Sequence, residues 1–144
     1  MRKLDAIVIH YTATQPGRVV SLAEIDGWHR ARGWAGIGYH FLISLDGVIE
    51  RGRPVGKIGA HVGGHNTGTI GIAYVGGLVA PNVGADTRTP AQFRALRFLV
   101  ASLRTTFGPL DVVGHRDLAA TQCPGFDVRG ETWPRGLSDL AKDI

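Results

Sequence analysis

Three side chains in this sequence could together hold a metal ion. Two apolar, β-branched runs each lead into a histidine, His10 and His115, and the single cysteine, Cys123, follows the second of them. A catalytic zinc typically takes three protein ligands and leaves a fourth tetrahedral position for water, and two histidines plus one cysteine form a known ligand set. Structural roles stay open at this point, because a free cysteine is most often a small buried hydrophobe.

The strands expected around these histidines follow from local composition. Residues 4–9 form a short apolar run rich in β-branched side chains, which predicts a buried strand ending at His10. Residues 110–114 have the same character and predict a last strand that delivers His115 at its end. Residues 69–75 predict a further strand between them.

Two capping boxes predict where two helices begin. Ser21 followed by Glu24 favours a helix over residues 21–32. Thr89 followed by Gln92, with a proline at the first helical position, begins a second helix. Its apolar residues recur at three- and four-residue spacing, which places them on one face.

The remaining segments are expected to form a hairpin and irregular connections. Residues 38–51 predict a hairpin, because Asp46-Gly47 supplies type I′ turn chemistry between two β-prone runs. Residues 52–68 are rich in glycine and without periodicity, which predicts a long loop of the kind that often carries function. Residues 76–88 and 116–130 are expected to be irregular as well.

Length, charge and hydropathy bound the class of protein. The 144 residues suit one domain. No stretch approaches the ~18 consecutive apolar residues of a membrane span, and the N-terminal apolar run is too short, and too early interrupted by Asp5, for a signal peptide. The net charge of +4 favours an anionic partner. The basic residues lack the interleaved aromatics of a nucleic-acid surface, which favours an acidic wall polymer.

Seven fragments, in order along nearly the whole chain, resemble zinc-dependent N-acetylmuramoyl-L-alanine amidases of the phage-lysozyme type, which are related to peptidoglycan recognition proteins. The fragments are Ile7–Thr14, Gly38–Phe41, Gly59–His61, Thr69–Ile72, Thr89–Gln92, Gly114–Asp117 and Cys123–Phe126. Any one of them could arise by chance, but the ordered set is specific to the family.

The resemblance implies that His10, His115 and Cys123 hold Zn²⁺, the same three residues chosen above from their types and positions. It also implies the bond that is cleaved, the amide between the lactyl group of N-acetylmuramic acid and the L-alanine of the stem peptide. Tyr39 occupies the family's catalytic tyrosine position, where its hydroxyl can stabilise a developing oxyanion. The adjacent His40 should then point away and pack in the core.

Two further site residues follow from the resemblance. Thr121 stands where many phage-type amidases have a lysine, so a catalytic role there rests on a neutral hydrogen bond instead of a positive charge. His61 resembles a family histidine that lines the substrate cleft, and we assign it to substrate binding. His65 and Asn66 are expected in a solvated loop, and His29 at the edge of the core. Asp117 could orient a ligand imidazole or cap its loop.

We therefore expect residues 1–144 to form one α/β amidase domain, with a mixed sheet flanked by helices and the zinc site at the carboxyl ends of strands. The expected role is that of a phage or prophage endolysin, held in the host cytoplasm before its release to the cell wall. Peptidoglycan is the expected partner. We expect a monomer, with no nucleic-acid or membrane partner.

Three rival functions remain at this stage. A non-catalytic peptidoglycan-binding module would keep the cleft and lose the chemistry, although binding-only relatives commonly have another residue in place of Cys123. A cysteine hydrolase would use Cys123 as its nucleophile and a histidine as its base. A cytoplasmic amidase would instead recycle soluble muropeptides.

Overall fold

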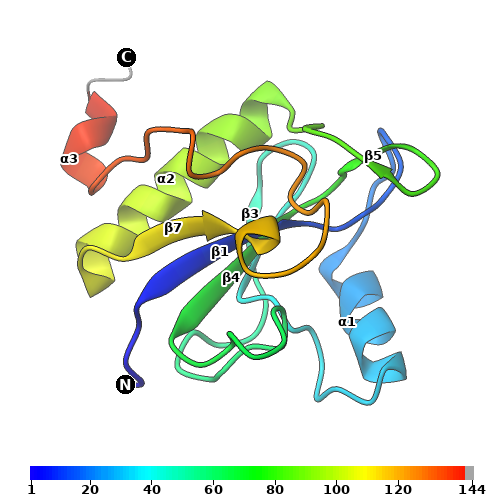
Figure 1. Cartoon of the computed structure of the whole chain (residues 1–144), viewed down its shortest axis with the longest axis horizontal. Helices are drawn as coiled ribbons and strands as arrows, with labels where there is room; N and C mark the ends of the chain where they lie inside the picture. Colours follow the sequence, from blue (N-terminus) through cyan, green and yellow to red (C-terminus); the bar gives the residue numbers. More distant parts are fainter. Residues whose placement is uncertain (142–144) are drawn as a thin grey trace.

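A five-stranded mixed sheet forms the centre of the molecule in the computed structural model, which describes residues 1–141 (Figure 1). The strand order is β3-β2-β4-β1-β7. The bounds are β1 Ala6–Tyr11, β2 Phe41–Ile43, β3 Ile49–Arg51, β4 Thr69–Tyr74 and β7 Asp111–Gly114. Strands β2, β4, β1 and β7 run parallel, and β3 pairs antiparallel with β2. The predicted mixed sheet is confirmed.

Strand β1 lies between β4 and β7 and is hydrogen-bonded to both in parallel register. This explains its continuous apolar sequence, because a central parallel strand is covered on both faces. Ile9 is opposite Gly114, so His10 lies at the carboxyl end of β1 beside His115, the residue that follows β7. The two strand ends that were expected to carry His10 and His115 are therefore neighbours in the sheet.

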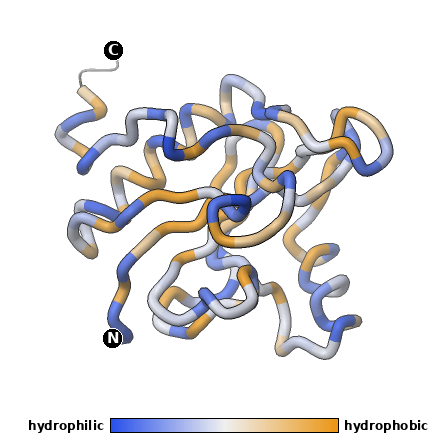
Figure 2. Tube along the Cα trace, viewed as in Figure 1, coloured by the Kyte–Doolittle hydropathy of each residue, from blue (hydrophilic) through white to orange (hydrophobic). Residues whose placement is uncertain are grey.

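Helices α1 (Leu22–Ala31) and α2 (Pro90–Phe107) cover opposite faces of this sheet. Both begin with the predicted capping boxes. The last helix, α3, is a single turn over Leu137–Leu140. Helix α2 packs on the alternate β1 residues Ile7 and Ile9, within the main apolar cluster. Hydrophobic residues accordingly follow the central strands in Figure 2.

The opposite face of β1 presents Val8 and His10, because successive strand side chains alternate. Val8 packs there against Val62 of the long 52–68 loop and Val113 of β7. That loop contains no helix or strand, as predicted. The face of the sheet that carries His10 is therefore covered by an irregular segment whose polar side chains can reach the histidine.

The turn between β2 and β3 differs from the expectation. Gly47 has a φ of 85°, whereas Asp46 is not among the residues with positive φ, so the type I′ assignment was wrong. The amide of Gly47 donates to the carbonyl of Ser44 at 2.9 Å, and that of Ser44 donates to Val48 at 3.0 Å. These bonds close a three-residue loop with glycine in the left-handed position, a second hairpin geometry that suits Asp-Gly.

Two other segments are more regular than expected. The 76–88 connection contains a small hairpin of β5 (Leu78–Ala80) and β6 (Val83–Gly84). A short 3-10 helix, η1 (His115–Asp117), follows β7 directly.

Within residues 1–141, no helix combines the length and the apolar character needed to cross a membrane.

Candidate active site

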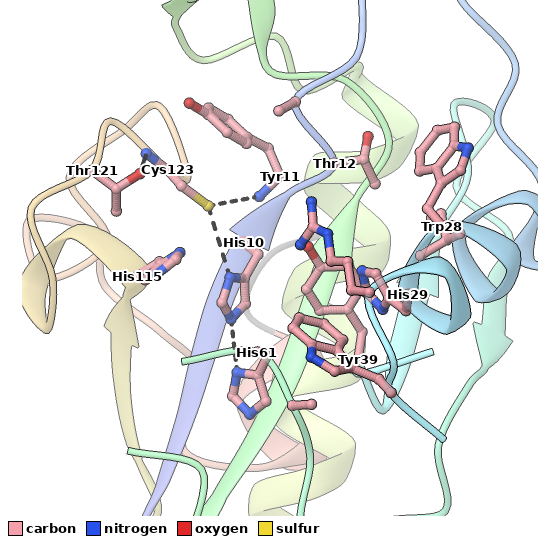
Figure 3. Close-up of a pocket in the computed structure, with 15 residues that line it drawn as sticks. His10, Tyr11, Thr12, Trp28, His29, Tyr39, His61, His115, Thr121 and Cys123 are labelled. Carbon is pink, nitrogen blue, oxygen red and sulfur yellow. Dashed lines mark hydrogen bonds between the residues drawn. The ribbon is translucent and has the colours of Figure 1, made fainter. Parts of the chain in front are cut away.

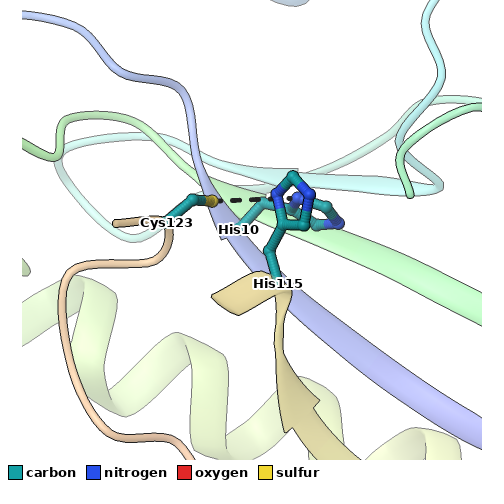
Figure 4. Close-up of side chains that lie close together, drawn as sticks. All are labelled: His10, His115 and Cys123. Carbon is teal, nitrogen blue, oxygen red and sulfur yellow. Dashed lines mark hydrogen bonds between the residues drawn. The ribbon is translucent and has the colours of Figure 1, made fainter. Parts of the chain in front are cut away.

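The side chains of His10, His115 and Cys123 converge at the carboxyl ends of β1 and β7 (Figure 4). Their potential ligand atoms all lie within 4.8 Å of one another. The Sγ atom of Cys123 is 3.8 Å from Nδ1 of His10, and both residues are buried. The structure thus brings together the three residues that the sequence analysis selected.

The donor set fits a zinc ion. Two zinc ligands at about 2.3 Å (sulfur) and 2.0–2.1 Å (nitrogen), held at a tetrahedral angle, lie roughly 3.5 Å apart. The measured 3.8 Å between Cys123 and His10 is close to that spacing. The backbone amide of Tyr11 also donates to the cysteine sulfur at 3.2 Å, a contact that stabilises a thiolate.

Burial favours the neutral forms of the three candidate ligands. Burial raises the pKa of Cys123 to about 12 and lowers the pKa of His10 well below its usual value, with the neighbouring His61 and His115 lowering it further. Burial also lowers the pKa of His115. A cation at the centre would reverse the effect on the thiol, because it favours the thiolate and needs neutral imidazoles.

The loop that carries Cys123 is anchored to the sheet and to the β5–β6 hairpin. The Tyr74 hydroxyl, at the end of β4, donates to the carbonyl of Pro124 at 2.7 Å. Gly125 has a φ of 87°, and a Cβ there would lie only 2.1 Å from the carbonyl oxygen of Ala85. Only glycine therefore allows this close approach between the two segments.

Arg88 also helps to hold the loop that carries Cys123 in place. Its guanidinium bonds Glu131 at 2.6 Å and Asp86 at 2.9 Å and lies over the Phe126 ring, 3.4 Å from the centroid. The Arg88 side chain is only 4% exposed. A buried charge with this many partners restricts movement of the segment after Cys123.

A chain of hydrogen bonds connects His10 to Thr69 through His61. Its Nε2 atom is 2.8 Å from Nδ1 of His61, and Nε2 of His61 is 3.2 Å from the Thr69 hydroxyl. Burial, followed by the charge of His40, lowers the pKa of His61 to about 3. His61 lines the cleft as expected, but both of its ring nitrogens already have protein partners.

The three candidate metal ligands line a cleft of about 260 Å³ (Figure 3). Tyr39 lines it with its ring centroid 5.2 Å from that of His10. Burial, followed by the charge of Cys123, raises the pKa of the Tyr39 hydroxyl, which keeps the hydroxyl protonated. Thr121 lines the opposite wall, and its oxygen accepts a hydrogen bond from the Cys123 amide at 3.2 Å.

Helix α1 and the residues directly after it form a wall of the cleft that the sequence analysis missed. His29 is buried, as expected, and it also lines the cleft together with Trp28, Arg32 and Trp34. The His29 ring centroid is 5.3 Å from that of Tyr39, and burial lowers the pKa of His29 to about 4. Residues 25, 28, 29 and 32 share one helix face by their spacing, which is the signal that could have found them.

The other sequence-selected residues have structural roles. His40 is buried, and its Nδ1 accepts from the Gly71 amide at 3.0 Å, so its Nε2 donates to the Lys57 carbonyl at 2.8 Å. Asp117 accepts from the Gly114 amide at 2.7 Å, which is the loop-capping alternative. His65 is exposed, as expected for a solvated loop.

Comparisons with known proteins show which family this chain resembles. The N-acetylmuramoyl-L-alanine amidase family matches residues 1–126. An endolysin of Klebsiella phage KP32 is 38% identical over 128 residues, which cover 89% of this chain and 85% of that relative. Peptidoglycan-recognition protein SC2 of Drosophila melanogaster is 35% identical, covering 90% of this chain and 74% of the relative.

A solved structure shows the same architecture. The endolysin N-acetylmuramoyl-L-alanine amidase LysCS from Clostridium intestinale superposes with a TM-score of 0.76 at 36% identity, covering 88% of this chain and 78% of the other. The family match, the relatives and this structural likeness lead to one conclusion: the chain belongs to the N-acetylmuramoyl-L-alanine amidase family.

Proposed function

We propose that this chain hydrolyses the amide bond between N-acetylmuramic acid and L-alanine in peptidoglycan, with a zinc ion held by His10, His115 and Cys123. The observation that carries the proposal is the convergence of these three ligands within 4.8 Å, in the lining of a cleft, in a member of the amidase family. Bound zinc would supply a Lewis acid that polarises the scissile carbonyl and activates water.

The remaining chemistry belongs to side chains in the cleft. Tyr39 stays protonated at neutral pH and donates a hydrogen bond to the oxyanion as it develops. The Thr121 oxygen already accepts from the Cys123 amide, which leaves its hydroxyl hydrogen to donate into the cleft. His61 has both nitrogens engaged, so it contributes to substrate binding through the surface of its ring.

The α1 side of the cleft suits a glycopeptide with carboxylates. Trp28 and Trp34 offer aromatic surfaces, and the Arg32 guanidinium lies 5.4 Å from the Trp34 ring centroid. An aromatic surface beside a cation binds the apolar face of a sugar or peptide and attracts an acidic group. The net charge of +4 adds attraction to an acidic wall.

The biological role that we propose is lysis of the bacterial wall as a phage or prophage endolysin, with residues 1–144 acting as a monomeric catalytic domain. The similarity to the Klebsiella phage KP32 endolysin supports this role. Under this proposal the protein is held in the host cytoplasm until release, and neither nucleic acid nor membrane is a partner.

Digestion of purified sacculi, followed by mass spectrometry, tests the activity. The expected products carry new free L-alanine amino termini without new reducing sugars. A chelator should abolish the reaction and zinc should restore it. Cleavage of the glycan, or full activity in the chelator, would refute the proposal, and the second result would favour a cysteine nucleophile. Binding without cleavage would show a recognition module, and a strong preference for soluble muropeptides would show a recycling enzyme.

A further inference from the structure

We propose that Thr69 and His61 are positioning residues that decide which nitrogen of His10 carries a proton, and so leave Nδ1 of His10 free to bind the metal. The inference rests on the metal site proposed above. It assigns a role to the Thr69 hydroxyl, which lies at the start of β4 and outside the residues that line the cleft, and a second role to His61.

The direction of the hydrogen bonds is set at Thr69. Its Oγ1 atom lies 2.8 Å from the carbonyl oxygen of His65, 3.2 Å from that of Asn66, and 3.2 Å from Nε2 of His61. Carbonyl oxygens only accept, and two oxygens 2.8 Å apart need a hydrogen between them, so the single hydroxyl hydrogen points at a carbonyl. The threonine oxygen is then left to accept, and His61 must carry its proton on Nε2.

The tautomer of His61 sets the tautomer of His10 through one short contact. With its proton on Nε2, His61 has a bare Nδ1, which lies 2.8 Å from Nε2 of His10. The hydrogen between these two atoms must come from His10. His10 therefore carries its proton on Nε2, and its Nδ1, which faces the Cys123 sulfur at 3.8 Å, has a free lone pair.

The opposite arrangement would block metal binding. If His61 carried its proton on Nδ1, it would donate to His10 and force the His10 proton onto Nδ1, the atom that faces Cys123. A metal binds only the unprotonated nitrogen, and the tautomer of a ligating histidine is set by the hydrogen bond that its other nitrogen makes. The Thr69 hydroxyl thus determines, through the His61 ring, which nitrogen of His10 is free to bind the metal.

The His61 ring is held in the place that this chain of bonds requires. Added Cβ atoms at Gly71 and Gly59 would lie 2.6 Å and 2.7 Å from its ring atoms, so the ring packs directly on two glycine backbones. The Asn66 side chain accepts from the backbone amides of His61 and Val62, both at 2.9 Å. The ring has little room to turn towards other partners.

A matched pair of variants tests the inference. Thr69→Val keeps the shape and β-branching of the side chain but removes the hydroxyl, whereas Thr69→Ser keeps the hydroxyl. We expect Thr69→Val to weaken zinc binding by about 10- to 100-fold, the usual effect of losing a group that orients a metal ligand. Thr69→Ser should bind zinc about as tightly as the parent. Competition with a chromophoric chelator at neutral pH measures all three affinities, and urea unfolding of the metal-free proteins checks that each one is folded.

Nitrogen-15 spectra of the histidine rings in the metal-free proteins provide a readout that a merely structural role would not change. The parent and Thr69→Ser should show His10 and His61 both protonated at Nε2, and Thr69→Val should show a shift towards Nδ1. A parent in which His10 carries its proton on Nδ1, or a folded Thr69→Val that binds zinc as tightly as the parent, would overturn the inference. If the parent itself binds no zinc, the metal site fails instead, while the ring spectra still decide the tautomers.

Discussion

The Tyr74 hydroxyl donates to the carbonyl of Pro124 at 2.7 Å and so joins the end of β4 to the loop that carries Cys123. Tyr74 is buried, with 1% of its surface exposed, and its ring lies 6.3 Å from that of Phe126. This hydrogen bond connects the central sheet to the segment that carries Cys123, which forms no helix or strand. We expect the position of the Cys123 sulfur to depend on this anchor and on the Tyr11 amide, which donates to the sulfur at 3.2 Å.

Tyr74→Phe should destabilise the protein by about 1–3 kcal/mol, because the buried carbonyl of Pro124 loses its donor while the ring packing is kept. Urea unfolding of the metal-free protein measures the change, with an unchanged m-value as the sign that the folded state is intact. Zinc affinity should fall as well, because the loop is less ordered. Equal stability and equal affinity would show that the anchor has no influence on the loop.

Tyr39→Phe should keep the metal and lower the turnover number by about 10²–10³-fold, as expected when one donor to a developing oxyanion is lost. The ring stays next to His10 and His29, so the cleft keeps its shape. Steady-state kinetics on solubilised peptidoglycan give the rate, and elemental analysis gives the metal content of the same sample. Near-parental turnover at full zinc occupancy would reduce Tyr39 to a packing residue.

Cys123→Ser should abolish detectable hydrolysis and greatly weaken zinc binding, because a neutral hydroxyl is a far poorer zinc ligand than a thiolate. The change nearly preserves side-chain size, and the cleft walls at Tyr39 and Thr121 do not depend on the sulfur. The variant should fold and still bind peptidoglycan. Because a cysteine nucleophile would also be lost, metal content must be measured together with activity. A serine variant that binds zinc as tightly as the parent would exclude Cys123 as a ligand.

His29 should make stability depend on pH below neutrality. Burial lowers its pKa to about 4 in the folded protein, against an ordinary value of 6.5. As the pH falls from about 6.5 to 4, the unfolded chain takes up a proton that the folded state refuses, so the free energy of unfolding decreases. One such group contributes a slope of at most about 1.4 kcal/mol per pH unit.

His29→Asn removes this proton while keeping an acceptor for the Gly38 amide, which donates to His29 Nδ1 at 2.8 Å. Urea unfolding of the metal-free parent and variant at several pH values between 7 and 4 should give a shallower slope for the variant, whatever its absolute stability. Identical slopes would mean that His29 titrates normally in the folded protein.

Features with local physical causes were predictable from the sequence. The capping boxes Ser21–Glu24 and Thr89–Gln92 are both present, since each is satisfied by hydrogen bonds within one turn of helix. The β-branched runs before His10 and His115 are strands, because such side chains favour the extended backbone. Local chemistry was insufficient at Asp46-Gly47, where two hairpin turns accept the same pair and the closing bonds between flanking residues choose one.

The sequence by itself determined which residues could bind a metal, because histidine and cysteine side chains at strand ends have that chemistry wherever they lie. Only the tertiary structure decided that they meet, by placing β1 next to β7 and by fastening the Cys123 loop to β4. The contact between His10 and His61, and the place of Trp34 in the cleft wall, were likewise beyond local patterns. Strand order and loop packing depend on how apolar surface is buried across the entire chain, and no short window of residues contains that information.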